Sequence, residues 1–363
     1  MAATSYSVTS VQQLATEPIN SIPQHFLRPD QEPPSPFFNE NTGPLPTIPI
    51  IDMKQLLSGE ASAEFELENL YSSCKEWGLF QVVNHGVSIS LLENLKHEIE
   101  GFFQLPLEEK MKYKKEGDFE GYGTVILSND QKLDWGDRFY MITNPLNRRK
   151  PHLFPELPSS LRITLESYIM ELQKLAMTLL GFLGKGVKMD VNEIGELFED
   201  GMQSVRMTYY PPCPQPEQVM GITAHSDATG ITILNQVNGV NGLELKKDGV
   251  WIPVNVKANA LVVNLGDILE ILSNGKYKSV EHRVSVNSKK ERISIATFFN
   301  PKFESEIGPM MKLTSPQNPP LYKRIQMEKY VKDFFSRRLD GKSYLELMRI
   351  KTEEQTANIY STT

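Results

Sequence analysis

Cysteine is scarce in this chain of 363 residues, which has only Cys74 and Cys213. Two isolated cysteines form neither a disulfide framework nor a cysteine-rich zinc motif, and they fit a protein of the reducing cytoplasm. An excess of basic residues is also missing, because 38 Lys and Arg stand against 45 Asp and Glu and give a net charge of −7. We therefore expect a cytoplasmic protein without a nucleic-acid partner.

Long apolar runs are absent as well. No stretch reaches the roughly 18 apolar residues that suggest a transmembrane helix, so we expect no membrane partner. The opening MAATSYSVTS has no basic region followed by an apolar one, so we expect no signal peptide. Hydrophobic residues make up 40% and charged residues 23% of the chain, which is an ordinary globular composition. Nothing in it suggests an obligate partner, and we expect a monomer.

Two kinds of hydrophobic periodicity divide the chain. After Pro158, apolar residues recur at spacings of three and four, which predicts a long helix. The residues of this stripe are Leu161, Leu165, Ile169, Leu172, Ala176 and Leu179. From about residue 203 the pattern changes to eight short strand-like runs, separated by Gly, Asn, Asp and Pro. Eight strands in about a hundred residues favour a double-sheet roll or sandwich. The tail from Tyr330 to Ile350 is predicted to be helical again.

Three residues form a candidate metal site: His225 and Asp227 in HSD, and His282 in VEHRV. Side chains two apart on a strand point to the same face, so His225 and Asp227 can reach one ion. Two histidines and one carboxylate are the ligand set of non-haem Fe(II) oxygenases, which leaves one face of the metal open. Taken singly, HSD also fits a surface turn, and His282 also fits a hydrogen-bonded core histidine.

A candidate acid-binding site follows in RIS. Arg292 and Ser294 share one face of a strand-like segment, and a guanidinium with a nearby hydroxyl can bind a carboxylate through two hydrogen bonds. Tyr210, in TYYPPCPQP, can add a third donor. The alternatives are an internal salt bridge for Arg292 and ordinary half-buried packing for Tyr210. It is the combination with the metal motif that favours a small-acid co-substrate.

These motifs occur in an order that resembles the plant Fe(II)- and 2-oxoglutarate-dependent dioxygenases of the senescence-related-gene type, a group similar to the codeine and thebaine O-demethylases. The resemblance covers about residues 10 to 350. The stretches that carry it are IPIIDM, EWGLFQVVNHGV, DQKLDWGDRFY, RKPHLFPELP, YYPPCPQP, GITAHSDATGITIL, WIPV, NLGDILEILSNGKYKSVEHRV and RISIATFFNP.

The resemblance implies a mainly β fold with a double-stranded β-helix (distorted jelly roll) core, flanked by N-terminal, central and C-terminal helices. It divides the chain into an N-terminal mixed α/β region (1–200), a jelly-roll core (201–303) and a C-terminal helical tail that is a candidate lid (304–363). It implies Fe(II) on the two histidines and the aspartate, with 2-oxoglutarate held by Arg292, Ser294 and Tyr210. Dioxygen is the second co-substrate, and ascorbate is expected to support activity.

The implied reaction releases succinate and CO2 and either hydroxylates or O-demethylates a small, aromatic plant specialised metabolite, an alkaloid or a phenolic. The candidate substrate contacts are Tyr122, Thr124, Phe139, Met141 and Phe298, each of which fits plain core packing equally well. One departure from the family concerns Thr208, which stands where NYYP is frequent and is expected to change a polar contact near the co-substrate.

Three competing interpretations remain open. An oxidase can use the same iron without consuming 2-oxoglutarate, and succinate production discriminates it. A catalytically idle binding protein can keep the fold, although such proteins usually lose a metal ligand. A zinc hydrolase can share the ligand set, but it leaves Arg292 and Ser294 without a role.

Overall fold

The computed structural model describes residues 10–16, 21–29, 46–124, 131–189 and 191–351. The predicted strand-rich region forms eight strands between Gln203 and Phe299, which confirms the change of periodicity near residue 203. They are β5 (Gln203–Tyr210), β6 (Ile222–His225), β7 (Ile231–Asn235), β8 (Leu243–Lys247), β9 (Val250–Pro253), β10 (Leu261–Leu265), β11 (His282–Val284) and β12 (Arg292–Phe299).

These strands separate into two sheets, the arrangement of a jelly roll that does not close into a barrel. The larger sheet contains β10, β7, β12 and β5 as consecutive neighbours, and the smaller one has the order β6-β11-β8-β9. β12 lies between β5 and β7, and every residue of this strand is buried. Its register places Arg292 opposite Tyr210 and Ser294 opposite Thr208, so the predicted acid-binding residues become neighbours.

The larger sheet is extended by strands from the N-terminal half of the chain. β1 pairs in parallel with β2, which joins β10, while β4 and β3 continue the sheet beyond β5. The bounds of these strands are β1 (Ile50–Asp52), β2 (Leu79–Val83), β3 (Gly121–Tyr122) and β4 (Asp137–Asn144). β4 was not predicted, and it contributes one wall of the cavity described below.

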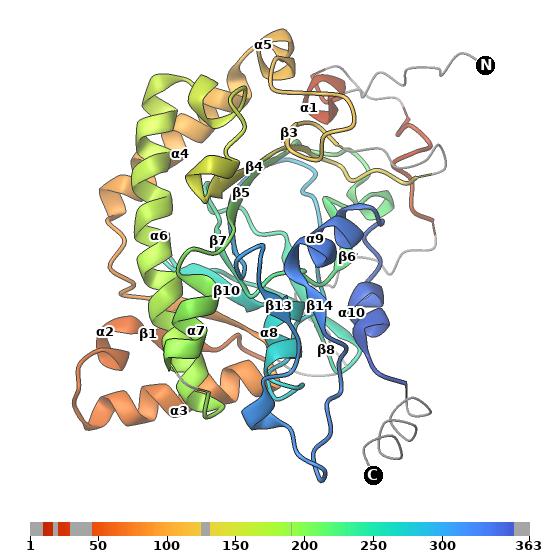
Figure 1. The fold of residues 1–363 in the computed structure, drawn as a ribbon. Coiled ribbons are helices and arrows are strands. Elements are labelled where there is room, and N and C mark those ends of the chain that lie inside the picture. Colours follow the sequence, from red (N-terminus) through yellow and green to blue (C-terminus); the bar gives the residue numbers. More distant parts are fainter. Residues whose placement is uncertain (1–9, 17–20, 30–45, 125–130, 190, 352–363) are drawn as a thin grey trace.

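Helices cover one side of the larger sheet. α6 runs from Ser159 to Gly186, and every residue of the predicted apolar stripe is buried. α4 packs along α6, and both lie on the same side in Figure 1. The remaining helices before the jelly roll are α1 (Val11–Leu14), α2 (Met53–Leu56), α3 (Ala61–Glu76), α4 (Ile89–Gln104), α5 (Leu107–Met111) and α7 (Val191–Phe198). Burial of the stripe against the sheet stabilises α6, as expected for an amphipathic helix.

The C-terminal tail differs from the continuous helix that was predicted. Two short helices, α9 (Met327–Phe335) and α10 (Ser343–Met348), lie on the opposite side of the sheets from α6. The helical conformation is interrupted between them, and Gly341 in this interruption has a φ of +49°. The amide of Ser226 donates to Gly341 O, and the amide of Gly341 donates to Ala224 O, so this break is fastened to the end of β6.

The remaining elements are short. A helix, α8 (Asp267–Leu272), connects β10 to the segment before β11, and β13 (Glu306–Ile307) pairs with β14 (Ile325–Gln326) beyond the jelly roll. Within the described ranges, no helix is both long enough and apolar enough to cross a membrane.

Candidate metal and co-substrate site

Three predicted metal ligands meet at one end of the smaller sheet. His225 ends β6 and lies opposite His282 on β11, while Asp227 follows two residues beyond the end of β6. Nε2 of His225 lies 3.4 Å from Oδ1 of Asp227, and Nε2 of His282 lies 3.7 Å from the same oxygen. All three side chains are buried, and one ligand atom of each lies within 4.8 Å of the others. The pairing of two strands that are far apart in the sequence therefore produces the cluster.

The two imidazoles are oriented by backbone carbonyls. Nδ1 of His225 lies 2.7 Å from Thr223 O, and Nδ1 of His282 lies 3.2 Å from Val280 O. A hydrogen on each Nδ1 satisfies these contacts and leaves the Nε2 lone pairs directed at the cluster. Burial, together with the nearby His225, lowers the pKa of His282 to about 4. At neutral pH its ring is therefore uncharged, as metal binding requires.

The carboxylate of Asp227 is held by two neighbours that the sequence patterns did not reveal. Thr232 Oγ1 donates to its Oδ2 over 2.6 Å, and Asn264 Nδ2 donates to the same oxygen over 2.8 Å. Oδ1 remains directed at the histidines. Burial alone raises the pKa of Asp227, but His282, His225 and Asn264 outweigh it and hold the pKa far below its usual range. The group is thus a carboxylate that presents one oxygen.

The donor set fits a divalent transition metal such as Fe(II). It combines two neutral imidazoles with one carboxylate oxygen, and the buried Nε2 of His225 has no hydrogen-bond partner. A buried acceptor without a partner is costly, and a bound metal removes that cost. Only three protein ligands converge within the described residues, which leaves coordination positions for small molecules.

The predicted acid-binding residues form a second cluster beside the first. Arg292, Ser294 and Tyr210 line a small cavity together with Asp227 and His282. Nη1 of Arg292 donates to Ser294 Oγ over 3.2 Å, and its guanidinium lies 5.1 Å from the centre of the Tyr210 ring. Its Nε and Nη2 are buried and have no partner. Two of the three nitrogens of this buried guanidinium thus lack the acceptors that they normally require.

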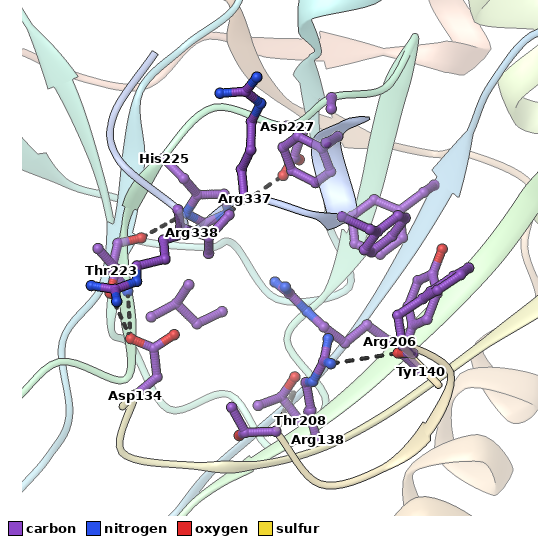
Figure 2. Close-up of a pocket in the computed structure, with 18 of the residues that line it drawn as sticks. Asp134, Arg138, Tyr140, Arg206, Thr208, Thr223, His225, Asp227, Arg337 and Arg338 are labelled. Atoms are coloured by element: carbon purple, nitrogen blue, oxygen red, sulfur yellow. Dashed lines mark hydrogen bonds and ion pairs between the residues drawn. The ribbon is translucent and has the colours of Figure 1, made fainter. Parts of the chain in front are cut away.

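A wider cavity of about 330 Å³ opens from the metal cluster. His225 and Asp227 form part of its wall, and Figure 2 shows polar side chains from several separate segments pointing into it. Two predicted substrate residues, Thr124 and Phe298, line this cavity. Aromatic residues from the tail also contribute: Phe335 stacks on Phe119, with ring centres 4.3 Å apart. The volume suits a small organic molecule.

The other three predicted substrate residues lie elsewhere. Phe139 and Met141 are fully buried in the main hydrophobic core, and Tyr122 is buried there with its hydroxyl bonded to Asp137. None of the three is among the residues that line the cavity. The structure therefore places these three side chains in the hydrophobic core and not along the cavity.

Strand alternation explains the placement of Phe139 and Met141. Successive residues of β4 point to opposite faces of the sheet, so Arg138 and Tyr140 face the cavity while Phe139 and Met141 face the helices. Because β4 was not recognised as a strand, its cavity-facing residues could not be chosen. Further lining residues that the patterns did not reveal are Arg206, Phe334, Phe335, Arg337, Arg338 and Leu339.

Thr208 lies at the border between the two cavities. It lines both of them, and on β5 it is flanked by Ser294 of β12 and Arg138 of β4. That Thr208, in place of the Asn frequent in the family, changes a polar contact near the co-substrate stays a prediction.

Comparison with known proteins identifies the class. Residues 201–301 match the 2OG-Fe(II) oxygenase superfamily, and residues 48–157 match the N-terminal region described as "non-haem dioxygenase in morphine synthesis". The chain belongs to the 2OG-Fe(II) oxygenases, and its cofactor is Fe(II), with 2-oxoglutarate and O2 as co-substrates.

Among its relatives are two plant demethylases. The chain is 49% identical to oxoglutarate-dependent flavonoid 7-O-demethylase 1 of Ocimum basilicum, over 96% of this chain and 92% of that relative. It is also 49% identical to codeine O-demethylase of Papaver somniferum, over 95% and 96% of the two chains. The crystal structure of JOX2 in complex with 2OG, Fe and JA superimposes with a TM-score of 0.86 at 34% identity, over 95% of this chain and 98% of that one.

Proposed function

We propose that His225, Asp227 and His282 hold Fe(II), and that Arg292, Ser294 and Tyr210 hold the far carboxylate of 2-oxoglutarate. The observation that carries this assignment is the pair of unsatisfied buried groups: Nε2 of His225 at the metal cluster, and Nε and Nη2 of Arg292 beside it. Iron and a carboxylate supply the missing partners. Both ligands are the ones named in the description of the family to which the chain belongs.

We further propose that the substrate is a small aromatic plant metabolite, an alkaloid or a phenolic, which the enzyme O-demethylates or hydroxylates. Two relatives that are each 49% identical to this chain are named as demethylases of a flavonoid and of codeine. The cavity supports this proposal, because the rings of Phe119, Tyr140, Phe298 and Phe335 lie around it. Such rings suit a planar ligand.

The iron centre, when loaded, supplies the oxidising power for one C–H bond while 2-oxoglutarate is converted to succinate and CO2. The residues of the chain position that bond and exclude water. Thr232 and Asn264 keep Asp227 in a one-oxygen geometry, and the two backbone carbonyls fix the histidine rings. For a methyl ether, insertion of one oxygen atom gives a hemiacetal, which breaks into formaldehyde and a free hydroxyl group.

The test is the stoichiometry of the products. With Fe(II), 2-oxoglutarate, ascorbate and a panel of methoxylated flavonoids and alkaloids, we expect succinate and formaldehyde in a ratio of about one, as the proposed demethylation requires. Formaldehyde without succinate indicates an oxidase that does not consume 2-oxoglutarate. A hydroxylated product without formaldehyde indicates oxidation at another carbon. Iron binding without any turnover across the panel indicates an idle binding protein.

We propose in addition that the enzyme is a cytoplasmic monomer, that ascorbate supports its activity, and that the tail after residue 304 acts as a lid. Both cysteines are buried and free, in keeping with a reducing compartment. Val331, Phe334 and Phe335 of α9 line the cavity, so this part of the tail is placed to cover a bound substrate. The division of the chain at residues 200 and 303 stays a prediction.

A further inference from the structure

Two arginines project into the cavity from neighbouring strands. Arg138 lies on β4 and Arg206 lies on β5, where Arg138 is opposite Thr208 and Arg206 is opposite Tyr140. Both side chains line the cavity that also contains His225 and Asp227. Figure 2 shows the two guanidinium groups pointing toward the middle of this cavity. Two like charges are therefore held near each other, close to the place where a substrate binds.

Among the described residues, the two guanidinium groups contact backbone carbonyls and an aromatic ring. Arg138 donates to two backbone carbonyls, Gly123 O at 3.1 Å and Phe119 O at 3.5 Å. Arg206 has a buried Nε without a partner, and its guanidinium lies over the ring of Phe298 at 5.6 Å. In the part of the chain that the structure describes, no Asp or Glu forms an ion pair with either residue.

Several other arginines of this protein are paired with acids, although the buried Arg292 of the proposed co-substrate site is not. Arg28, at the same cavity, binds Asp134 at 2.9 Å, and Arg149 binds Glu166 through two nitrogens. The contrast sets Arg138 and Arg206 apart. Burial and the nearby Arg206 lower the pKa of Arg138 to about 10, so the pair is held at an electrostatic cost. Such a cost is removed when a ligand brings a negative charge.

We propose that Arg138 and Arg206 form an anion subsite that binds a carboxylate group of the organic substrate. This inference rests on the proposed function, since it concerns the substrate of the same cavity. The carboxylate bridges the two guanidinium groups, the aromatic part lies against Phe298 and its neighbours, and the carbon to be oxidised faces His225 and Asp227. Guanidinium groups suit this role because they bind carboxylates through two parallel hydrogen bonds. The preferred substrates are thus aromatic acids.

The experiment compares acids with their neutral amides. We would use methoxylated cinnamic and benzoic acids and the corresponding primary amides, which have nearly the same shape but no charge. Binding to the enzyme with Fe(II) and saturating 2-oxoglutarate, without oxygen, is followed by tryptophan fluorescence, and turnover in air is followed by formaldehyde. We expect the best acid to bind roughly 10- to 100-fold more tightly than its amide, the gain typical of charge-assisted hydrogen bonds.

Arg138→Gln and Arg206→Gln are each expected to remove most of this preference. The Kd of the acid should rise roughly 10-fold or more, while the Kd of the amide should change less than about 2-fold. Arg148→Gln is the matched control, because Arg148 is exposed and lies outside the cavity. Thermal melting checks the fold of each variant, and if a Gln variant does not fold, the Lys variant, which keeps the charge, should retain part of the preference for acids.

Three results would overturn the subsite. One is that no acid binds better than its amide. Another is that the Gln variants weaken acid and amide equally, which indicates a structural role. The third is that Arg206→Gln weakens the binding of the co-substrate and leaves the acid preference intact, which assigns Arg206 to 2-oxoglutarate, since it also borders the smaller cavity. Acid-selective binding without formaldehyde would contradict only the O-demethylation, because binding and turnover are measured separately.

Discussion

The metal end and the mouth of the cavity are built in contrasting ways. At the metal end, formed by His225, Asp227, His282, Thr232 and Asn264, the orienting hydrogen bonds come from within the protein. At the mouth, formed by Phe119, Arg138, Arg206, Phe335 and Arg337, three arginines line the cavity, and for these three no ion pair with an acid is found among the described residues. The contrast indicates that contacts within the protein fix the geometry of the metal ligands. The arginines at the mouth, in contrast, are left to interact with the substrate, and they are expected to determine which substrates bind.

The contrast also concerns the origin of the residues. The metal end comes from β6, β7, β10 and β11 of the jelly roll, whereas the mouth combines the segment before β3 with β4, β5 and the tail. Changes at the metal end should therefore abolish the reaction for every substrate. Changes at the mouth should alter which substrates are used. The following predictions test this division, beginning with the largest effect.

Asp227→Asn should break the metal end. The amide keeps the size of the side chain but removes the negative charge that one metal ligand supplies, so we expect activity to fall by about 1,000-fold or more. In the wild-type enzyme we expect a weak visible charge-transfer band when Fe(II) and 2-oxoglutarate are added without oxygen, and this band should be missing in Asp227→Asn. Asp248→Asn is the matched control, since this turn residue is exposed and has a φ of +52°, which Asn tolerates. A persisting band in Asp227→Asn would contradict the assignment.

Arg292→Gln should separate the co-substrate from the metal. The substitution removes the buried guanidinium whose Nε and Nη2 are proposed to bind the far carboxylate of 2-oxoglutarate. We therefore expect the KM of the co-substrate to rise roughly 100-fold, the cost of losing a charged hydrogen-bond partner. Iron binding, measured by calorimetry, should stay within about 3-fold of the wild type, since Arg292 is not a metal ligand. Arg324→Gln removes a surface charge and serves as the control. An unchanged KM would leave Arg292 as a structural residue.

Phe335→Ala should affect the mouth alone. It removes the ring that stacks on Phe119, so we expect the KM of the organic substrate to rise about 5- to 10-fold, consistent with the loss of one aromatic contact. The KM of the co-substrate should not change. Phe65→Ala, at an exposed position with 75% of the residue accessible, is the control. If both KM values rise together, the tail supports the metal end as well, and the division between the two regions fails.

Thr208→Asn should have the smallest effect on the kinetics of the four substitutions, and it tests the border between the co-substrate cavity and the wider cavity. It restores the residue frequent in the family at a position that lines both cavities. Since Arg292 and Ser294 are intact, the KM of the co-substrate should change by less than about 3-fold, the size of a weak single hydrogen bond. Steady-state kinetics for both substrates decides the matter. A change of 10-fold or more would place Thr208 within the co-substrate site.

The sequence by itself determined the reaction class. The short motifs HSD, EHR and RIS carry their meaning in residue type and spacing, and an apolar stripe of period 3.6 is sufficient to predict α6. The change to eight strands near residue 203 was predictable for the same reason, since alternation and turn residues are local signals. Local patterns suffice here because each such element satisfies its backbone hydrogen bonds in a repetitive way.

The tertiary structure alone decided the cavity. Which face of β4 points inward depends on its pairing with β5, so Arg138 and Tyr140, not Phe139 and Met141, became candidate contacts. The support of Asp227 by Asn264 required β10 to lie beside β7. The break at Gly341 placed the tail against β6. Such contacts join residues far apart in the chain, and the register of distant strands, unlike local periodicity, is fixed only when the whole core packs.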